Sequence, residues 1–175
     1  MKKKVVILVV TILASVNLVT AQIQDVQKGQ HNYGIGLNAG VTVGDFEDAY
    51  SSNIGIDLFY LYSISERFYL GGSTGFANYF GEEINRLGSG TIELDDAQFI
   101  PLAGSVRFSP FRNFLVGADV GYAFGVNEGN DGGFYASPRL TYMVNGNMPI
   151  FIGYRTISFE DDNLGSIQFG IGYRF

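Results

Sequence analysis

The sequence predicts an all-β fold, an eight-stranded antiparallel up-and-down transmembrane β-barrel preceded by a cleavable signal peptide. Three observations predict it. Eight segments alternate apolar with small or polar residues, which is the period of a strand whose two faces meet different surroundings. The charged residues inside these segments lie on the face opposite to the apolar one. The connections between the segments are alternately short and longer, as in barrels that cross a membrane.

The amino terminus has the three regions of a secretory signal peptide. Three lysines at positions 2–4 precede an apolar run over residues 5–19, and small residues up to Ala21 form a cleavage site. As a helix, this run would span about 22 Å, less than the roughly 30 Å of a bilayer core. An uncleaved membrane anchor is therefore the weaker alternative. Because the chain has no cysteine, it can carry neither an amino-terminal lipid on cysteine nor a disulfide.

The eight predicted strands follow in order after residue 32. Abundant glycine (24 residues) and aromatic residues (15%) favour short strands over helices. No later stretch of 18 apolar residues exists, so a membrane-spanning mature chain must form a closed barrel. Most segments have about the 9–11 residues that a tilted strand needs to cross a bilayer. The predicted strands are 33–43, 53–63, 68–80, 97–108, 114–125, 134–144, 148–156 and 166–175.

Each strand is justified by its apolar face and by the chemistry of its ends. Asn145 and Gly146 tolerate positive φ and predict a tight turn. Pro101 and Pro138 lack the amide that a closed sheet needs, which predicts bulges or strand ends there. The outward residues on six of the strands are Tyr33, Ile35, Leu37, Ala39 and Val41; Ile54, Ile56, Leu58, Tyr60 and Tyr62; Ile100, Leu102, Val106 and Phe108; Val116, Ala118, Val120, Tyr122 and Phe124; Leu140 and Tyr142; Ile167, Phe169, Ile171, Tyr173 and Phe175.

The charged residues inside the strands predict a charge network in the lumen. An arginine facing lipid at the midplane costs about 2–4 kcal/mol, whereas an eight-stranded barrel has an interior just wide enough for side chains to fill. Buried charges need partners. If Gly125 pairs near Gly133, then Asp119 lies opposite Arg139, and we expect that pair. The predicted network is Asp57, Arg107, Asp119, Arg139, Arg155 and Arg174. A selective pore lined by arginine is the alternative to a hydrogen-bonded plug.

The longer connections are acidic. Such carboxylates either bind divalent cations or form solvated loops beside a cation-bridged glycolipid leaflet. The segment 127–132 lacks the spaced ligands of an EF-hand, and we predict no metal site. The acidic residues are Asp45, Glu47, Asp48, Glu82, Glu83, Glu93, Asp95, Asp96, Glu128, Asp131, Glu160, Asp161 and Asp162.

The whole chain after about residue 30 resembles the small eight-stranded outer-membrane barrels, similar to the OmpA barrel and its OmpX-type relatives. The strand at residues 166–175 resembles the carboxyl-terminal signal by which such barrels are recognised for assembly. The resemblance implies a monomer that is inserted by the barrel assembly machinery and is surrounded by outer-membrane lipid and glycolipid. The residues of the assembly signal are Phe169, Ile171, Tyr173 and Phe175.

These observations predict a non-enzymatic integral protein of the cell outer membrane with an envelope-structural or surface-interaction role. Its divisions are a signal peptide (1–21), a short periplasmic segment (22–32) and the barrel (33–175), with both mature termini periplasmic. A narrow channel for small solutes or ions is the alternative, and a hydrolase or acyltransferase at the rim or a soluble secreted β-barrel or sandwich is less favoured. With no cysteine and one histidine, His31, before the first strand, no catalytic residues are assigned. We expect no cofactor and no nucleic-acid partner, and the surface ligand is open.

Overall fold

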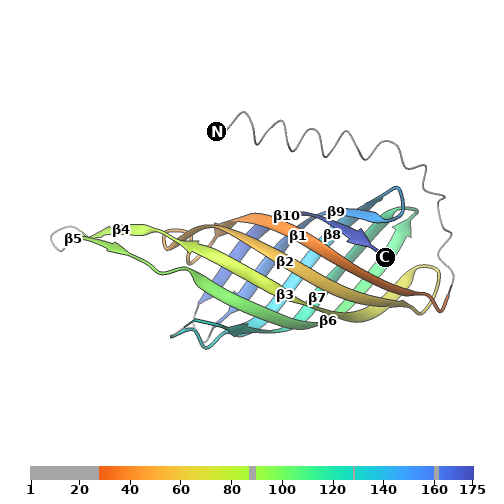
Figure 1. Ribbon diagram of the computed structural model, residues 1–175, viewed down its shortest axis with the longest axis horizontal. Coiled ribbons are helices and arrows are strands. Elements are labelled where there is room, and N and C mark those ends of the chain that lie inside the picture. The colour runs from red at the N-terminus through yellow and green to blue at the C-terminus, as the bar shows by residue number, and fades with distance from the viewer. Residues whose placement is uncertain (1–27, 87–89, 128, 160–161) are drawn as a thin grey trace.

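Eight antiparallel strands close into a barrel in the computed structural model, which describes residues 28–86, 90–127, 129–159 and 162–175 (Figure 1). Each strand pairs with its sequence neighbour in the wall, and β1 pairs with β10 to close the ring. The predicted eight-stranded fold is confirmed. The wall strands are β1 (His31–Val43), β2 (Tyr50–Ser63), β3 (Phe68–Gly81), β6 (Ala97–Phe111), β7 (Phe114–Gly125), β8 (Gly133–Val144), β9 (Met148–Ser158) and β10 (Asn163–Arg174).

The strands differ from their predicted ranges mainly at their ends. Strand β1 begins at His31, two residues before the predicted start of the barrel. The predicted signal peptide lies outside the described residues. Within the described part of the chain, no helix is long and apolar enough to cross a membrane.

Two further strands stand outside the wall. Strands β4 (Glu83–Arg86) and β5 (Gly90–Glu93) pair with each other in a separate two-stranded sheet. This hairpin projects past one end of the barrel (Figure 1). It occupies the segment that the sequence predicts as a plain loop, because its strands are too short to show a period.

The two ends of the barrel differ in their connections. The short-turn end has the turns at 64–67, 112–113 and 145–147, together with residue 28 and Phe175. The long-loop end has the connections at 44–49, 82–96, 126–132 and 159–162. Asn113, Asn145 and Gly146 have φ of 73°, 52° and 74°, so the predicted positive-φ turn at Asn145–Gly146 is confirmed.

The prolines do not produce the predicted bulges. The β3–β6 register is the same on both sides of Pro101, and the β8–β9 register is the same on both sides of Pro138. Each proline therefore removes a ladder hydrogen bond without inserting a residue. The register shift in β6 falls instead between Phe108 and Phe111, where Pro110 lies. A bulge tolerates a residue without an amide hydrogen, which explains this position.

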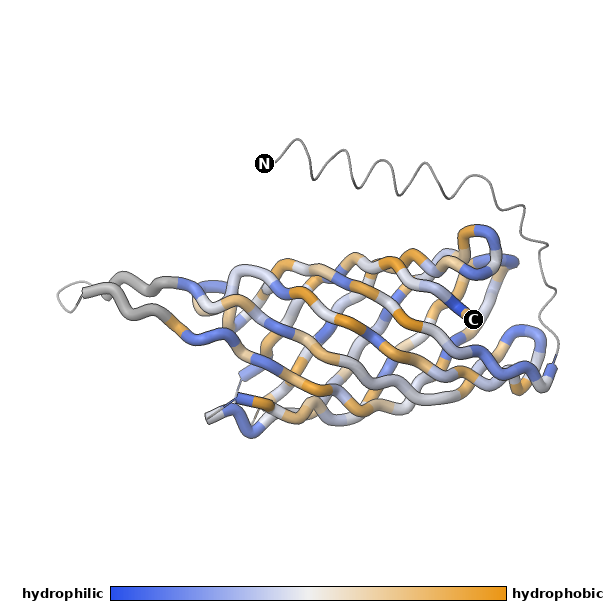
Figure 2. The backbone as a smooth tube through the Cα atoms, in the orientation of Figure 1, coloured by the Kyte–Doolittle hydropathy of each residue, from blue (hydrophilic) through white to orange (hydrophobic). Residues whose placement is uncertain are grey.

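The two faces of the wall separate as the alternation predicts. Apolar and polar residues alternate along the strands (Figure 2). Outward residues are exposed, with Leu102 and Phe169 each 62% accessible, while Asp119 and Arg155 are fully buried. At the short-turn end, outward aromatic rings lie in pairs, such as Phe68 with Phe108, whose centroids are 4.7 Å apart. The wall thus presents an apolar belt outside and its charges inside.

Candidate functional site in the barrel lumen

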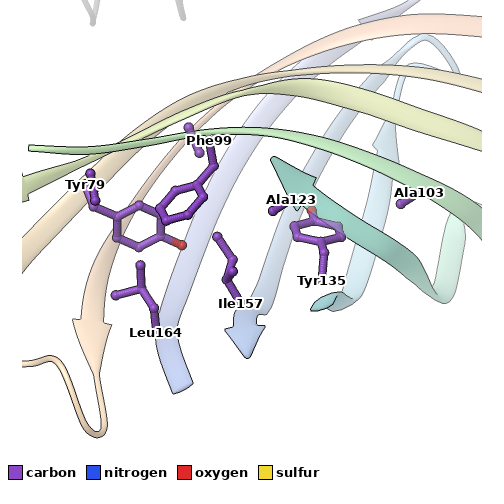
Figure 3. Close-up of a cluster of buried hydrophobic side chains, with 9 residues drawn as sticks. Tyr79, Phe99, Ala103, Ala123, Tyr135, Ile157 and Leu164 are labelled. Carbon is purple, nitrogen blue, oxygen red and sulfur yellow. The ribbon is translucent and has the colours of Figure 1, made fainter. Parts of the chain in front are cut away.

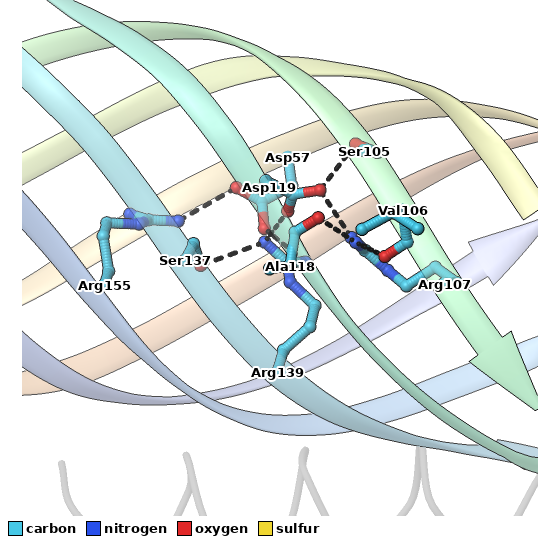
Figure 4. Close-up of polar contacts among 9 residues, drawn as sticks. All are labelled: Asp57, Ser105, Val106, Arg107, Ala118, Asp119, Ser137, Arg139 and Arg155. Atoms are coloured by element: carbon cyan, nitrogen blue, oxygen red, sulfur yellow. Dashed lines mark hydrogen bonds and ion pairs between the residues drawn. The ribbon is translucent and has the colours of Figure 1, made fainter. Parts of the chain in front are cut away.

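Five charged residues form an alternating chain of ion pairs inside the lumen (Figure 4). Arg155 contacts Asp57 at 3.1 Å, and Asp57 contacts Arg139 at 3.3 Å. Arg139 reaches Asp119 at 2.8 Å, and Asp119 accepts from Arg107 at 2.7 Å. We call Arg155, Asp57, Arg139, Asp119 and Arg107 the ion chain. Both carboxylates are bound by two guanidinium groups each, so neither is available as a general base.

The ion chain crosses the barrel. In the order of strands around the wall, β2 lies four places from β8 in either direction, so Asp57 and Arg139 come from opposite sides. Asp119 and Arg107 lie on β7 and β6. The ion chain therefore ties opposite walls of the barrel together.

The predicted pair of Asp119 and Arg139 forms, but the predicted register is wrong. Gly133 pairs with Ala123 and not with Gly125, so Asp119 faces Ser137 and Arg139 faces Gly117. The loop backbone explains the shift, because the carbonyl of Asn130 lies against Gly125 where a Cβ would be. The two charges meet diagonally, across a separation that long side chains span.

Small residues on the neighbouring strands make room for the ion chain. Gly117 and Gly153 flank Arg139 on its two sides. Gly36 and Gly75 flank Asp57 in the same way. A Cβ on Gly117 would meet the backbone of β6 and the side chain of Arg107. The inward glycines thus let the long guanidinium side chains lie along the wall and reach across it.

Arg174 lies apart from the ion chain. Its guanidinium donates a 2.5 Å hydrogen bond to the carbonyl oxygen of Gly146 in a turn at the short-turn end. Among the described residues, the salt bridges join the other five members of the predicted network. The proposed assembly-signal residues all face outward, with accessibilities of 62% for Phe169, 42% for Ile171, 50% for Tyr173 and 73% for Phe175. Their role as an assembly signal stays a prediction.

An apolar cluster fills the lumen above the ion chain, toward the long-loop end (Figure 3). Tyr79, Phe99, Ile157 and Leu164 are at most 1% accessible, and the rings of Tyr79 and Phe99 meet edge to face at 5.8 Å. The Tyr79 hydroxyl lies 3.1 Å from Ser166 Oγ. Alternation along the strands did not reveal this apolar cluster, although its side chains take the same inward parity as the charges. The full cluster is Ala77, Tyr79, Ala97, Phe99, Ala103, Ala123, Tyr135, Ile157 and Leu164.

A cavity lies on the other side of the ion chain, toward the short-turn end. Its water-accessible volume is about 60 Å³. We call it the short-turn cavity. Its wall contains Asn32, Gly36, Asp57, Phe59, Leu61, Tyr69, Arg107, Leu115, Arg139, Thr141, Met143, Pro149, Phe151, Gly172 and Arg174.

The long-loop end carries an open hollow above the apolar cluster. Phe46, Tyr50 and Phe159 surround it together with Asp95 and Asp131. Of the acidic residues predicted for this end, Glu83, Glu93, Glu128, Glu160 and Asp161 fall outside the residues whose side chains are described. Within the described part, no group of three or more His, Asp or Glu side chains is placed to hold a metal ion.

Hydrogen bonds hold the loops around this hollow in place. The Asp96 carboxylate accepts from Asn78 Nδ2 at 2.8 Å and from the amide of Gly81 at 3.1 Å. Asn127 Nδ2 donates to the carbonyl of Asp96 at 2.8 Å, and Asn130 Nδ2 donates to the carbonyl of Gln98 at 3.0 Å. The loop 126–132 is thereby bonded to β6 and to the residue before it.

Solved structures share this fold. The crystal structure of Ail, the attachment invasion locus protein of Yersinia pestis, matches with a TM-score of 0.57 and 19% identity, over 85% of this chain and 100% of that one. OprG from Pseudomonas aeruginosa matches at 0.52 and 12%, over 88% and 99%. The amino-terminal barrel domain of OprF from the same organism matches at 0.52 and 14%, over 85% and 100%. No curated protein sequence matches the chain.

The family assignment rests on a match to the whole barrel. A family model described as the outer membrane protein beta-barrel domain matches residues 10–175. This range contains all eight wall strands and ends at the last residue of the chain. The chain belongs to the outer membrane protein beta-barrel domain family.

Proposed function

We propose that this protein is a closed, non-conducting and non-enzymatic barrel of the outer membrane, with an envelope-structural or surface-interaction role. In this proposal the long-loop end is extracellular, both termini of the mature chain are periplasmic, and the barrel is a monomer. The observation that carries the proposal is the double closure of the lumen. The ion chain joins opposite walls, and the apolar cluster packs the section above it.

The two closures differ in chemistry, and each blocks the lumen without the other. If the ion chain is broken, the apolar cluster still excludes water and ions from the lumen. If the apolar cluster is opened, the charged side chains still cross the lumen. A permeating ion needs both to move. A narrow channel is the second candidate function, because the short-turn cavity already brings an open space up to the ion chain.

Conductance across planar bilayers tests the closure. We expect the wild-type protein to be silent, and the variants Arg139→Ala and Phe99→Ala/Ile157→Ala each to remain silent. Combining all three substitutions removes both closures and should give openings. Steady openings of the wild-type protein would contradict the proposal and favour the channel.

Labelling of intact cells tests the orientation. Because the chain has no cysteine, a single one can be introduced at exposed Asp131 in the long-loop end or at exposed Glu66 in a short turn. A membrane-impermeant maleimide should label Asp131→Cys in whole cells and Glu66→Cys after the envelope is opened. The reverse pattern would overturn the proposed orientation.

The negative charge of the long-loop end limits the chemical class of surface partner that we propose for it. Exposed carboxylates surround it, among them Asp45, Glu47, Asp48 and Asp162. A structure of Ail from Yersinia pestis holds the heparin analogue sucrose octasulfate, an anion. Like charges repel across an interface, so we expect this barrel not to bind sucrose octasulfate. Calorimetric titration at low salt measures this, and clear binding would argue against an acidic recognition surface.

A further inference from the structure

The hollow at the long-loop end is large enough to hold a small molecule. Its water-accessible volume is about 480 Å³, and small-molecule sites have volumes of roughly 300–1,000 Å³. We call it the long-loop hollow. Phe99 and Leu164 of the apolar cluster, each 1% accessible, line it on the side of the lumen. Residues of four connections form the rest of its wall and leave it open to solvent.

Aromatic rings line the long-loop hollow from separate segments of the chain. The centroid of the Phe46 ring lies 5.9 Å from that of Phe159, edge to face, and 6.3 Å from that of Tyr50. The Phe159 centroid in turn lies 6.4 Å from that of Phe99. Phe46, Tyr50 and Phe159 are only partly buried. Aromatic rings gathered around one space are typical of sites for quaternary ammonium groups.

Backbone hydrogen bonds order the segments that carry these rings. The carbonyl of Phe46 accepts from the amide of Tyr50 at 2.9 Å, and the amide of Phe159 donates to the carbonyl of Asp162 at 2.9 Å. A ligand therefore meets rings on a backbone that is already ordered, which lowers the entropic cost of binding.

The charge of the wall is negative. Asp95 and Asp131 are exposed residues of the wall, and the described residues that line it include no Lys, Arg or His. In the sequence, the four connections at this end contain one basic residue, Arg86. The long-loop hollow therefore attracts cations. A metal ion fits poorly, because the described part of the chain places no group of three or more His, Asp or Glu side chains together.

The acceptors in the wall favour a cation that has no N–H groups. Asn127 Oδ1 already accepts from the Gln98 amide at 3.1 Å and from Asn130 Nδ2 at 3.3 Å. Asn130 Oδ1 accepts from the amide of Gly132 at 3.1 Å. A primary ammonium has three donors that need partners when it leaves water. A trimethylammonium group has none, and its methyl groups can contact the rings while the exposed carboxylates stay hydrated.

The β4–β5 hairpin favours a dissolved ligand over a lipid surface. It projects past the end of the barrel (Figure 1), and Leu94 and Asp95, which follow β5 directly, line the long-loop hollow. A strand of four residues spans about 13 Å. A flat lipid surface would meet the hairpin before it reached the rings, whereas a dissolved molecule can enter the hollow.

We propose that the long-loop hollow binds a small, soluble quaternary ammonium compound. Its trimethylammonium group lies among Phe46, Tyr50 and Phe159, and Asp95 and Asp131 neutralise its charge. This site gives a chemical class to the proposed surface-interaction role and in that sense rests on the proposed function. Conduction by the wild-type barrel would refute the closed lumen and leave this site standing, whereas a failure to bind choline would refute this site and leave the closed lumen standing.

Leucine methyl resonances test the site in the refolded barrel, held in octyl glucoside because this detergent has no charge and no ammonium group. Leu94 lines the long-loop hollow, and outward-facing Leu102 is the internal control. At constant ionic strength, choline should give saturable shifts at Leu94 and none at Leu102. The neutral analogue in which a tert-butyl group replaces trimethylammonium should bind at least tenfold more weakly. Equal binding of the two, or no shift of Leu94 with choline, would overturn the proposal.

Two further titrants fix the class of ligand. Methylammonium should bind at least threefold more weakly than choline, and tighter binding would show that the carboxylates and not the rings select the ligand. Glycerophosphocholine, the soluble headgroup of a lipid, should also bind more weakly, because its phosphate is repelled by Asp95 and Asp131. Tighter binding of glycerophosphocholine would assign the site to a lipid headgroup and contradict the choice of a soluble ligand.

Variants separate this site from the general negative charge of the loops. Asp95→Asn/Asp131→Asn should weaken choline binding at least fivefold. Glu47→Gln/Asp48→Asn removes two exposed charges outside the wall and should change the affinity less than twofold at physiological salt, where charges are screened beyond about 8 Å. Phe159→Leu keeps an apolar side chain without the ring and should weaken choline, but not the neutral analogue, at least threefold. Equal effects of the two charge variants would leave only non-specific attraction and refute the site.

Discussion

Replacing Asp119 by asparagine should destabilise the barrel more than any other single change of charge in the ion chain. Asp119 is fully buried, accepts hydrogen bonds from Ser105 Oγ at 2.5 Å and from Arg107 at 2.7 Å, and forms an ion pair with Arg139 at 2.8 Å. Asparagine keeps the volume and one acceptor oxygen but removes the charge, which leaves two guanidinium groups short of a partner. Breaking a buried ion pair on one side costs about 3–5 kcal/mol. A loss of about 3 kcal/mol lowers the folding equilibrium constant roughly 100-fold.

Urea titration of the refolded barrel in lipid vesicles measures this loss, with far-ultraviolet circular dichroism as the signal because the chain has no tryptophan. Asp57→Asn is the matched control. It makes the same change of charge, but Asp57 has longer contacts of 3.1 and 3.3 Å and is 8% accessible at its side chain. We expect a smaller loss there. If Asp119→Asn costs less than about 1 kcal/mol, the range of exposed ion pairs, the reasoning from burial is refuted.

Three further changes test the wall and the loops. Leu102→Arg places a charge on the apolar belt and should cost about 2–4 kcal/mol, against about 0–1 kcal/mol for Ser51→Arg near the long-loop end, by the same urea titration; equal costs would contradict the belt. Gly71→Ala would push its Cβ into a backbone carbonyl of β2 and should cost about 1–3 kcal/mol or more, whereas Gly104→Ala, with its nearest neighbour at 3.8 Å, should fold with wild-type yield and gel mobility. Asp96→Ala removes two hydrogen bonds to β3 and should speed proteolysis of the long-loop end; unchanged cleavage would show that these bonds do not hold the loop.

The wall of this barrel is predictable from the sequence because each strand has two different environments. Lipid admits apolar side chains and the lumen admits charges, so a period of two fixes which residues face inward. Asp57 and Arg155 could be placed in the lumen on this basis alone. Their contact could not, because β2 and β9 are not neighbours in the wall and alternation says nothing about the opposite side of a barrel.

The apolar cluster and the β7–β8 register depend on where residues lie along the barrel axis, which alternation does not give. Phe99 and Ile157 share the inward parity of Arg107 and Arg155. Parity places all four side chains in the lumen, but it does not show that the two apolar ones gather in a separate cluster. The register of β7 with β8 is set by how residues 130–132 fold against Gly125, which is a tertiary contact within an irregular loop. An error of two residues keeps every side chain on its correct face. The pair of Asp119 and Arg139 was therefore predicted correctly from an incorrect register.

The residues beside the charges show how a narrow barrel can hold so many of them. Asp119 has a short side chain, and its neighbours on the adjacent strands are Ser105 and Ser137. Arg139, which must extend across the lumen, has glycine on both sides. A side chain larger than glycine at Gly117 would occupy the path of Arg107 as well. The geometry of the ion chain therefore depends on the small residues beside the arginines as much as on the charged residues themselves. Substitutions at these glycines should break the ion pairs even though every charged residue is still present.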